Sequence, residues 1–446
     1  QTLSGHSFLL SNVMKANYKK KNGGVADLEW KASFADKRGM LNMSETKMSQ
    51  LLRQRNFQSE ATGSLLAFTI PHLMFNLNGK VMFDWQRVSA GLNSLSDASG
   101  SEQKTWLLGA FVSPKILLHF GNRLQWLVYV PVGVKYYHSA DGSLDYDKRF
   151  FSTCPYSNLT YKPTGRLSFD LTTICEESMP SVLSQMVLKH YVNYRTTMSN
   201  PHQVEIAPNR SVKLAFTSSY KDIIKMLFGG VTLSYVDARN GNSMGYQVVD
   251  DVVNYIVQPQ STKNRVWQIE QMVSKGFFRW NSKISESLSI GTSRSEYYVG
   301  GDCHDGRSDY LQAKISYVAS VRKWLNLSIS NDYSVSKPYT DGKASGEVYR
   351  TFMNASSFTF WLGKQLNVVP SVQYYHNNYF SSGRNNVFLN TVMEYYWGNA
   401  TLSLKCTNLL DSRTFHRIID NGITRYSGEY QLRGRTILFG IRIKII

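Results

Sequence analysis

The sequence predicts an all-β protein, an antiparallel up-and-down transmembrane β-barrel with long extracellular loops and short periplasmic turns. Three observations predict this fold: apolar residues that recur at every second position, short turns that alternate with long polar loops, and a strand pattern that reaches the end of the chain. A period of two is typical of β-strands, because successive side chains face opposite sides of a sheet.

The final segment has the sharpest alternation. Its apolar face is formed by Ile437, Phe439, Ile441, Ile443 and Ile445. The positions between them include Arg442 and Lys444, so that one face is wholly apolar and the other carries two charges. A soluble β-sandwich can contain such a strand, but a barrel in lipid requires a last strand that closes its edge.

Earlier segments repeat the alternation. The clearest apolar faces are Leu124, Trp126, Val128, Val130, Val132 and Val134 in one segment, and Leu325, Leu327, Ile329, Tyr333 and Val335 in another. In a sandwich this face would point into the core, whereas in a large barrel it meets lipid and the polar face lines the lumen. The pattern alone leaves both architectures open, and the spacing of the segments together with the last strand favours the barrel.

Short turns and long loops alternate along the chain. We place short turns at 19–24, 121–122, 162–165, 322–324, 363–365 and 398–399, and long loops at 36–57, 92–103, 138–153, 176–209, 240–264 and 297–307. Strand directions assigned from the C-terminus give about nineteen strands, of which the first, near residues 6–18, and the last both run to the periplasm. A barrel with an even number of strands starts upward from the periplasm, so we expect at least one further strand before Gln1.

The composition excludes several classes of function. Lys and Arg number 50 against 32 Asp and Glu, giving a net charge of +18, but the basic residues are scattered and form no RNA-binding signature. We therefore expect no nucleic-acid partner, and interpret the charge as a solvated surface, a rim facing lipopolysaccharide phosphates, or a lumen that favours anions. No nucleophile motif, phosphate-binding loop or dinucleotide fingerprint is present, so we expect no enzyme activity and no cofactor.

Cys154 and Cys175 are a candidate disulfide. They flank a hairpin whose turn we place at Thr164 and Gly165. A two-residue turn puts Cys154 directly opposite Cys175, where Cα atoms lie about 4.5–5.5 Å apart and a disulfide fits. The alternative is two buried thiols, because a register shift of one residue places the side chains on different faces.

Two further groups of residues have alternative interpretations. Asp302, Asp305 and Asp309 crowd with His304 and several glycines, which suits either oxygen ligation of Ca²⁺ or an extracellular loop tip; we expect no metal. Seven tryptophans lie near inferred strand ends, namely Trp106, Trp126, Trp267, Trp280, Trp324, Trp361 and Trp397. They fit an interfacial girdle, and the alternative for any one of them is stacking on a sugar ligand.

Two segments near the C-terminus resemble a known family. The sequence NLLDSRTF, from Asn408 to Phe415, resembles the asparagine-leucine-phenylalanine-aspartate element on the penultimate strands of TonB-dependent outer-membrane transporters. Residues 430–445 resemble the closing strand of the Bacteroidota branch of that family. Two departures stand out: Gly434 occupies a position where the branch usually has proline, and the chain ends in Ile446 rather than an aromatic residue.

The resemblance covers roughly residues 155–446 and implies an active transporter of the cell outer membrane. Such a barrel has about 22 strands, a plug domain in its lumen and a coupling to TonB, which uses the inner-membrane proton-motive force. We recognise no plug and no TonB-contacting segment in the chain, and therefore interpret residues 1–446 as a single barrel region from which the plug and about three strands are absent.

The resemblance also implies partners. They are outer-membrane lipid and lipopolysaccharide, the TonB system through that plug, and a surface lipoprotein as a further candidate. The sequence does not identify the ligand or the residues that contact it. The alternative interpretation is a plugless outer-membrane barrel that acts as a passive pore or a surface-binding module.

Overall fold

The computed structural model describes most of the chain in detail. The described residues are 2–19, 25–43, 48–93, 98–141, 144–187, 189–193, 196–201, 203–249, 252–379, 384–420 and 425–444. No helix among them is long and apolar enough to cross a membrane.

Nineteen strands form one antiparallel wall, in which each strand pairs with the next wall strand along the chain. The first eight are β1 (Thr2–Lys19), β2 (Val25–Met43), β3 (Met48–Ile70), β4 (Leu73–Asn93), β5 (Ala98–Phe120), β6 (Leu124–Tyr129) continued by β7 (Val132–Asp141), β8 (Leu144–Thr153) continued by β9 (Tyr156–Tyr161), and β10 (Leu167–Ser178). The next six are β13 (Asn209–Asp222), β14 (Leu227–Asn240), β17 (Thr262–Phe277), β18 (Ser282–Val299), β19 (Asp302–Arg322) and β20 (Leu325–Thr340). The last five are β22 (Tyr349–Leu362), β23 (Leu366–Asn377), β24 (Asn385–Trp397), β25 (Ala400–Thr407) and β28 (Thr436–Ile443).

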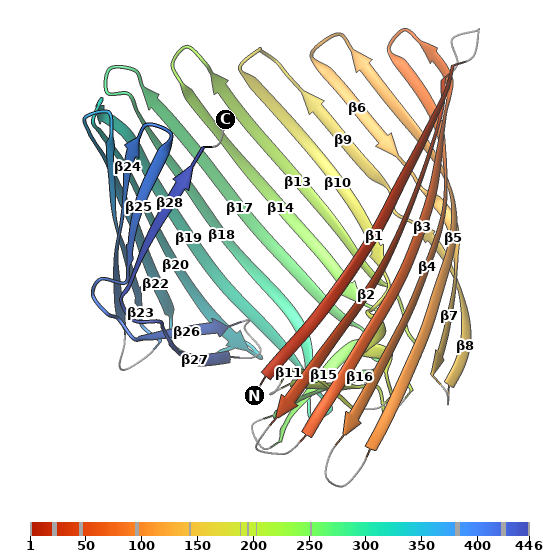
Figure 1. The fold of residues 1–446 in the computed structure, drawn as a ribbon. Helices are drawn as coiled ribbons and strands as arrows, with labels where there is room; N and C mark the ends of the chain where they lie inside the picture. The colour runs from red at the N-terminus through yellow and green to blue at the C-terminus, as the bar shows by residue number, and fades with distance from the viewer. Residues whose placement is uncertain are drawn as a thin grey trace.

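The wall is curved and its strands are tilted (Figure 1). Strands β1 and β28 lie at its two margins and point the same way, toward the end that carries the short turns. Among the described residues no pairing joins β1 to β28. The predicted strand count and the shared direction of the first and last strands are thereby confirmed.

The wall has an apolar outer face and a polar inner face. Val134 and Ile269, which a sandwich would bury, have 52% and 48% of their surface exposed. Leu233, Ile290 and many other large apolar side chains share this exposure. Contiguous exposed apolar surface of this extent marks contact with lipid, so the alternation seen in the sequence belongs to a barrel and not to a sandwich.

The short turns agree with the sequence prediction. Gly121, Gly363 and Gly398 adopt φ values of 59°, 74° and 54°, and only glycine takes up this left-handed conformation without steric cost. The predicted turn at 19–24 lies mostly outside the described residues. Five tryptophans lie close to the short turns, and Trp106 and Trp267 lie nearer the loops; the five are Trp126, Trp280, Trp324, Trp361 and Trp397. Two aromatic levels of this kind fit the predicted girdle.

Four of the predicted long loops, 36–57, 92–103, 138–153 and 297–307, consist mostly of wall strand. β2 continues to Met43 and β3 begins at Met48, within the predicted loop 36–57. The predicted loop 297–307 is a tight turn at Gly300 and Gly301 between β18 and β19. These strand extensions carry polar side chains on both faces, because they stand beyond the lipid, and they therefore lack the alternation that reveals a strand.

The loops at the opposite end from the short turns contain small elements of their own. These are the 3₁₀-helix η1 (Val182–Gln185), β11 (His190–Asn193), β12 (Thr196–Ser199), β15 (Ser243–Val249), β16 (Val252–Gln258), β21 (Lys343–Ala344), and the separate hairpin β26 (Thr414–Asp420) with β27 (Arg425–Gln431). Strand β12 pairs parallel to β16, and β15 pairs parallel to β18. The second pairing ties the loop that contains β15 and β16 to the wall, and the first ties the loop that contains β12 to that loop.

Cysteine labelling tests the orientation of the wall. In a parent in which the four native cysteines are replaced by serine, Ser99→Cys at the loop end should react with an impermeant thiol reagent on intact cells. Lys364→Cys, in the short turn between β22 and β23, should react only after the outer membrane is permeabilised. Labelling of Lys364→Cys alone on intact cells would contradict this orientation.

Candidate functional site

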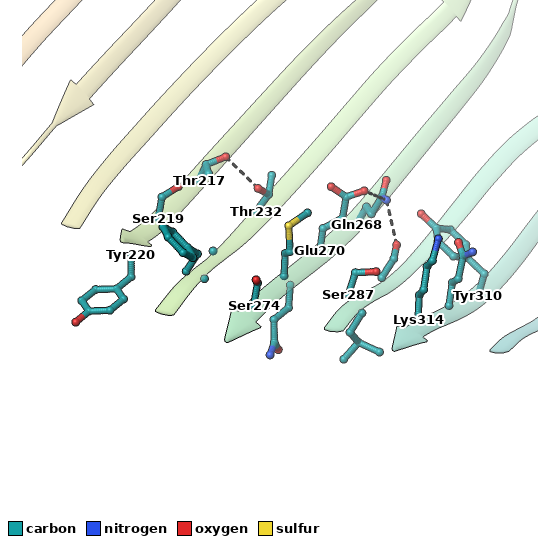
Figure 2. A pocket seen from close by; sticks show the side chains of 18 residues that line it. Thr217, Ser219, Tyr220, Thr232, Gln268, Glu270, Ser274, Ser287, Tyr310 and Lys314 are labelled. Carbon is teal, nitrogen blue, oxygen red and sulfur yellow. Dashed lines mark hydrogen bonds between the residues drawn. The ribbon is translucent and has the colours of Figure 1, made fainter. Parts of the chain in front are cut away.

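A polar hollow lies on the inner wall, across β13, β14, β17, β18 and β19 (Figure 2). Its volume is about 720 Å³. Apolar residues such as Phe228, Met272 and Leu288 contribute to its lining, and the polar side chains there include Thr217, Ser219, Thr232, Gln268, Glu270, Ser274, Ser287, Ser289, Gln312 and Lys314. They come from alternate positions of neighbouring strands, the positions opposite to those of the exposed apolar residues. The two-residue period of the sequence thus produces a continuous polar surface inside the barrel.

Hydrogen bonds within one strand and between neighbouring strands hold this surface in place. The Gln268 side-chain amide donates to Glu270 Oε1 at 2.6 Å and to Ser289 Oγ at 3.1 Å, and the hydroxyls of Thr217 and Thr232 lie 3.1 Å apart (Figure 2). No His or Cys lines the hollow. Ordered hydroxyl, amide and charged groups suit contact with water or with another polar surface.

A glycine is required at the edge of this surface. The Tyr310 ring lies across Gly291, where an added Cβ would come within 2.5 Å of the ring and 2.6 Å of the Trp267 carbonyl oxygen. Contacts this close are not tolerated, so the missing side chain at Gly291 lets the Tyr310 ring lie flat on the wall.

The loop that contains η1 is fixed inside the mouth of the barrel. Val182 and Met186 pack against Val88 and Ala90 of β4 in a small buried apolar cluster. Along this loop the 3₁₀-helix η1 comes first and the short strand β11 follows.

Buried polar contacts add to this apolar packing. Gln185 Oε1 accepts hydrogen bonds from the Tyr137 hydroxyl at 2.5 Å and the Ser139 hydroxyl at 3.1 Å, and the Gln103 amide donates to Ser139 Oγ at 2.7 Å. Gln103, Tyr137, Ser139 and Gln185 are all buried. The Gln103 Oε1 atom has no hydrogen-bond partner among the described residues, but the other bonds of this buried network restrict the loop, which therefore presents a defined surface at the mouth.

A second hollow, of about 450 Å³, lies among the loops next to η1. Tyr246, Tyr255 and Tyr297 contribute aromatic rings to its lining, and Asn240 and Asn242 contribute amides. Aromatic rings with a few amides are the usual lining of sites that bind small molecules. Sequence reasoning did not single out these residues, because four separate chain segments meet there and no local pattern marks them.

The acidic stretch around His304 is engaged with its own chain. Asp341 Oδ2 lies 2.8 Å from His304 Nδ1, and Asp341 Oδ1 accepts the Asp305 backbone N–H at 2.9 Å. His304, followed by that N–H, holds the pKa of Asp341 below its ordinary value. Arg307 makes two hydrogen bonds to the Asp309 carboxylate, at 2.9 and 2.8 Å. The described residues include no group of three or more His, Cys, Asp or Glu that could hold a metal ion.

The register around Cys154 and Cys175 differs from the prediction by one residue. Tyr156 pairs with Ile174, which places Pro155 and not Cys154 opposite Cys175, and the Cys175 N–H donates to the Pro155 carbonyl at 3.1 Å. Neither Cys154 nor Pro155 belongs to β8 or β9, and this break allows the Cys154 thiol to interact with that of Cys175 despite the shift. Both residues are free thiols in the structure, and the disulfide stays a prediction.

The family-like motif at residues 408–415 forms a compact hydrogen-bonded turn beside the closing strand; we call it the Asn408 turn. Asn408 is 8% exposed, and its side chain donates to the carbonyls of Ser412 and Arg433 at 2.8 and 3.1 Å. Asn408 Oδ1 in turn accepts the Ser412 N–H at 2.9 Å. The φ of Asn408 is 53°, a left-handed conformation that asparagine tolerates better than other side chains. One amide thereby fastens the turn after β25 to the segment that leads into β28.

Asp411 adds further contacts to the Asn408 turn. Its carboxylate accepts the Arg435 N–H at 2.9 Å and pairs with Arg413 at 2.9 Å; these two contacts, in that order, hold its pKa below the ordinary value. A Cβ at Gly434 would come within 2.7 Å of Asp411 Oδ1. The glycine that departs from the family pattern therefore gives the Asp411 carboxylate the space it occupies.

Comparison with solved structures identifies the fold. The ferric citrate transporter FecA superposes with a TM-score of 0.58 at 11% sequence identity, over 98% of this chain and 61% of the FecA chain. The copper transporter OprC superposes with a TM-score of 0.50 at 10% identity, over 98% of this chain and 80% of the OprC chain. No protein-family model matches the sequence, and no curated protein matches it.

The chain has the barrel fold of the outer-membrane transporters. The resemblance to TonB-dependent transporters that the terminal segments suggested is thereby confirmed, and it is a resemblance of fold at these low sequence identities.

Replacing Asn408 tests how much the Asn408 turn contributes to stability. Asn408→Ala leaves the Ser412 N–H and two carbonyls without partners and places alanine in a left-handed conformation, so we expect a loss of about 3 kcal/mol in the free energy of unfolding. Urea unfolding of the refolded barrel in lipid, followed by tryptophan fluorescence, measures this loss. Asn399→Ala, at an exposed turn residue, is the matched control. Equal free energies of unfolding for the two variants would show that the Asn408 hydrogen bonds do not stabilise the barrel.

The predicted disulfide is tested by mass spectrometry of the protein isolated under alkylating conditions from an oxidising compartment. We expect a peptide pair that joins Cys154 to Cys175, and Cys175→Ser should release Cys154 for alkylation. Quantitative alkylation of both thiols in the unmutated protein would disprove the disulfide.

Proposed function

We propose that this chain is the barrel of a TonB-dependent transporter, located in the outer membrane, that takes up a scarce ligand with energy supplied through TonB. The carrying observation is the nineteen-strand wall, apolar outside and polar inside, together with its superposition on FecA over 98% of the chain. The two transporters compared above are named for ferric citrate and for copper, so the same wall serves different ligands. On this proposal the extracellular loops select the ligand.

We infer further that residues 1–446 are one barrel region, completed by a plug domain and about three more strands. Two observations support this. The margins of β1 and β28 are unpaired among the described residues, and unpaired backbone groups in lipid cost several kcal/mol each. Since β1 and β28 point the same way, an odd number of added strands is needed to join them by antiparallel pairing.

The inner wall supports a plug as its occupant. Gln268, Glu270, Gln312 and Lys314 present amides and charges toward the lumen, and a folded polar domain meets such groups with complementary hydrogen bonds. On this proposal the TonB system acts on the plug rather than on the wall. A surface lipoprotein is a further candidate partner at the loop end.

Bilayer and binding measurements on the complete protein test this function. A plugged transporter should show no steady conductance in planar bilayers, and it should bind the purified periplasmic domain of TonB. Urea, which unfolds a plug before the barrel, should open a steady conductance. A steady conductance without urea, together with no binding of TonB, would overturn the proposal and indicate a passive pore.

A further inference from the structure

On the outer face of β14, β17, β18, β19 and β20, residues that pair across neighbouring strands form rows that run around the wall. Several such rows lie near the loop end. The row furthest from the loops is apolar, and the strand registers place its members side by side: Leu233, Ile269, Ile290, Leu311 and Val335. A hollow of about 560 Å³ opens on this row and is lined by all five of its side chains. A concave apolar surface on the lipid-facing side of the wall suits acyl chains.

The next row toward the loops is the interfacial level. In register order it contains Tyr235, Trp267, Thr292, Asp309 and Lys337. The rings of Tyr235 and Trp267 have their centroids 4.4 Å apart, and Trp267 is half exposed. Tyrosine and tryptophan at this level mark the boundary between acyl chains and head groups.

Directly beyond it, three arginines stand side by side. Arg265 pairs with Arg294 across β17 and β18, and Arg294 pairs with Arg307 across β18 and β19. Like charges directly opposite one another on neighbouring strands are destabilising. Their side chains are exposed, and strands about 4.8 Å apart place the outer two about 10 Å apart, the span of one bulky head group.

The chain neutralises this row only in part. Arg265 lies 3.5 Å from Asp237, and Arg307 is held by Asp309, while no ion pair within the described residues involves Arg294. Tyr339 ends the row, with the Arg307 guanidinium 5.3 Å and the Lys337 ammonium 5.2 Å from its ring centroid. Over the arginine row and the interfacial level together, four cations therefore face two carboxylates. The cations are Arg265, Arg294, Arg307 and Lys337, and the carboxylates are Asp237 and Asp309.

On these five strands the excess of positive charge does not continue into the next row toward the loops. One row further from the membrane, Glu296, Asp305 and Asp341 stand beside Arg239 and Lys263, so carboxylates outnumber cations there. A band of cations directly above an apolar hollow, and bounded by carboxylates beyond it, matches the charge profile of an anionic lipid whose phosphate lies at the membrane surface.

We propose that this face, the arginine row with the hollow beneath it, binds a phosphorylated lipid of the outer leaflet. The acyl chains occupy the hollow, and the phosphate groups are bound by Arg265, Arg294 and Arg307. Guanidinium groups bind phosphate oxygens through paired N–H donors, and the bound phosphate relieves the repulsion between the arginines. The proposal depends on the outer-membrane location given above and is independent of coupling to TonB.

Lipid binding by the complete protein tests the proposal. Delipidated protein in mild detergent is titrated with bisphosphorylated lipid A, with fully dephosphorylated lipid A and with inorganic phosphate, and complexes are counted by native mass spectrometry. We expect bisphosphorylated lipid A to bind, and Arg294→Gln to weaken it about tenfold, the effect of one charge-assisted hydrogen bond. Lys323→Gln, which removes the same charge from the exposed short turn between β19 and β20, should leave binding unchanged.

A stability measurement accompanies the titration, with heat-modifiable gel migration to verify that each variant is folded. Bisphosphorylated lipid A should raise the unfolding midpoint of the unmutated protein and not that of the triple variant R265Q/R294Q/R307Q. Equal lipid binding by the triple variant and Lys323→Gln would overturn the proposal. So would equal affinity for dephosphorylated lipid A, or inorganic phosphate binding as tightly as the lipid. Failure here leaves conductance and TonB binding unaffected, so the two proposals fail separately.

Discussion

The whole structure depends on one constraint, the pairing of every backbone N–H and C=O group within lipid. Nineteen antiparallel strands meet this constraint everywhere between the two margins of the wall by bonding each strand to the next along the chain, and the proposed additional strands would meet it at β1 and β28. Once the ladders are formed, the two-residue period leaves each strand with one face toward lipid and one toward the lumen. The apolar exterior, the polar hollow and the arginine row all follow from this arrangement.

The constraint also explains where the side-chain hydrogen bonds that fix individual segments occur. Most of the wall is repetitive, and its turns are short; their left-handed positions are held by glycine in three turns and by His72, Met226 and Asn281 in three others. The exceptions lie at the end opposite the short turns. There Asn408 and Asp411 fasten the closing strand, and Gln185 fixes a loop inside the mouth. A wall that is held by ladders leaves its loops available for ligand selection, which agrees with the proposed transporter function.

The sequence allowed most of the wall to be predicted, because alternation survives in each membrane-spanning segment. Val132 and Val134 were assigned to an apolar face and are exposed as a lipid-facing pair. The extensions of β2 and β18 beyond the lipid were not predicted, since polar residues on both faces remove the alternation. The predicted pairing of Cys154 with Cys175 was wrong by one residue, because the interruption of the strand at Pro155 is visible only in the strand pairing.

The candidate site was beyond the reach of sequence reasoning for a related reason. The polar hollow draws on strands from Thr217 to Lys314, and the arginine row becomes visible only when the registers of β17, β18 and β19 are known. A shift of one residue in any of these registers would turn an arginine toward the lumen. Sites of this kind are properties of pairing, whereas strands and turns are properties of local pattern.

The most direct test of the account is the accessibility of spin labels along β17 in lipid bilayers. Labels at Trp267, Ile269 and Gln271 should collide with oxygen dissolved in lipid, and labels at Gln268 and Glu270 should collide with a water-soluble nickel complex, so that accessibility alternates from residue to residue. The alternation should be in phase with that of Ile290 and Leu288 on β18. Uniform exposure to the water-soluble complex along β17 would contradict a membrane-spanning wall.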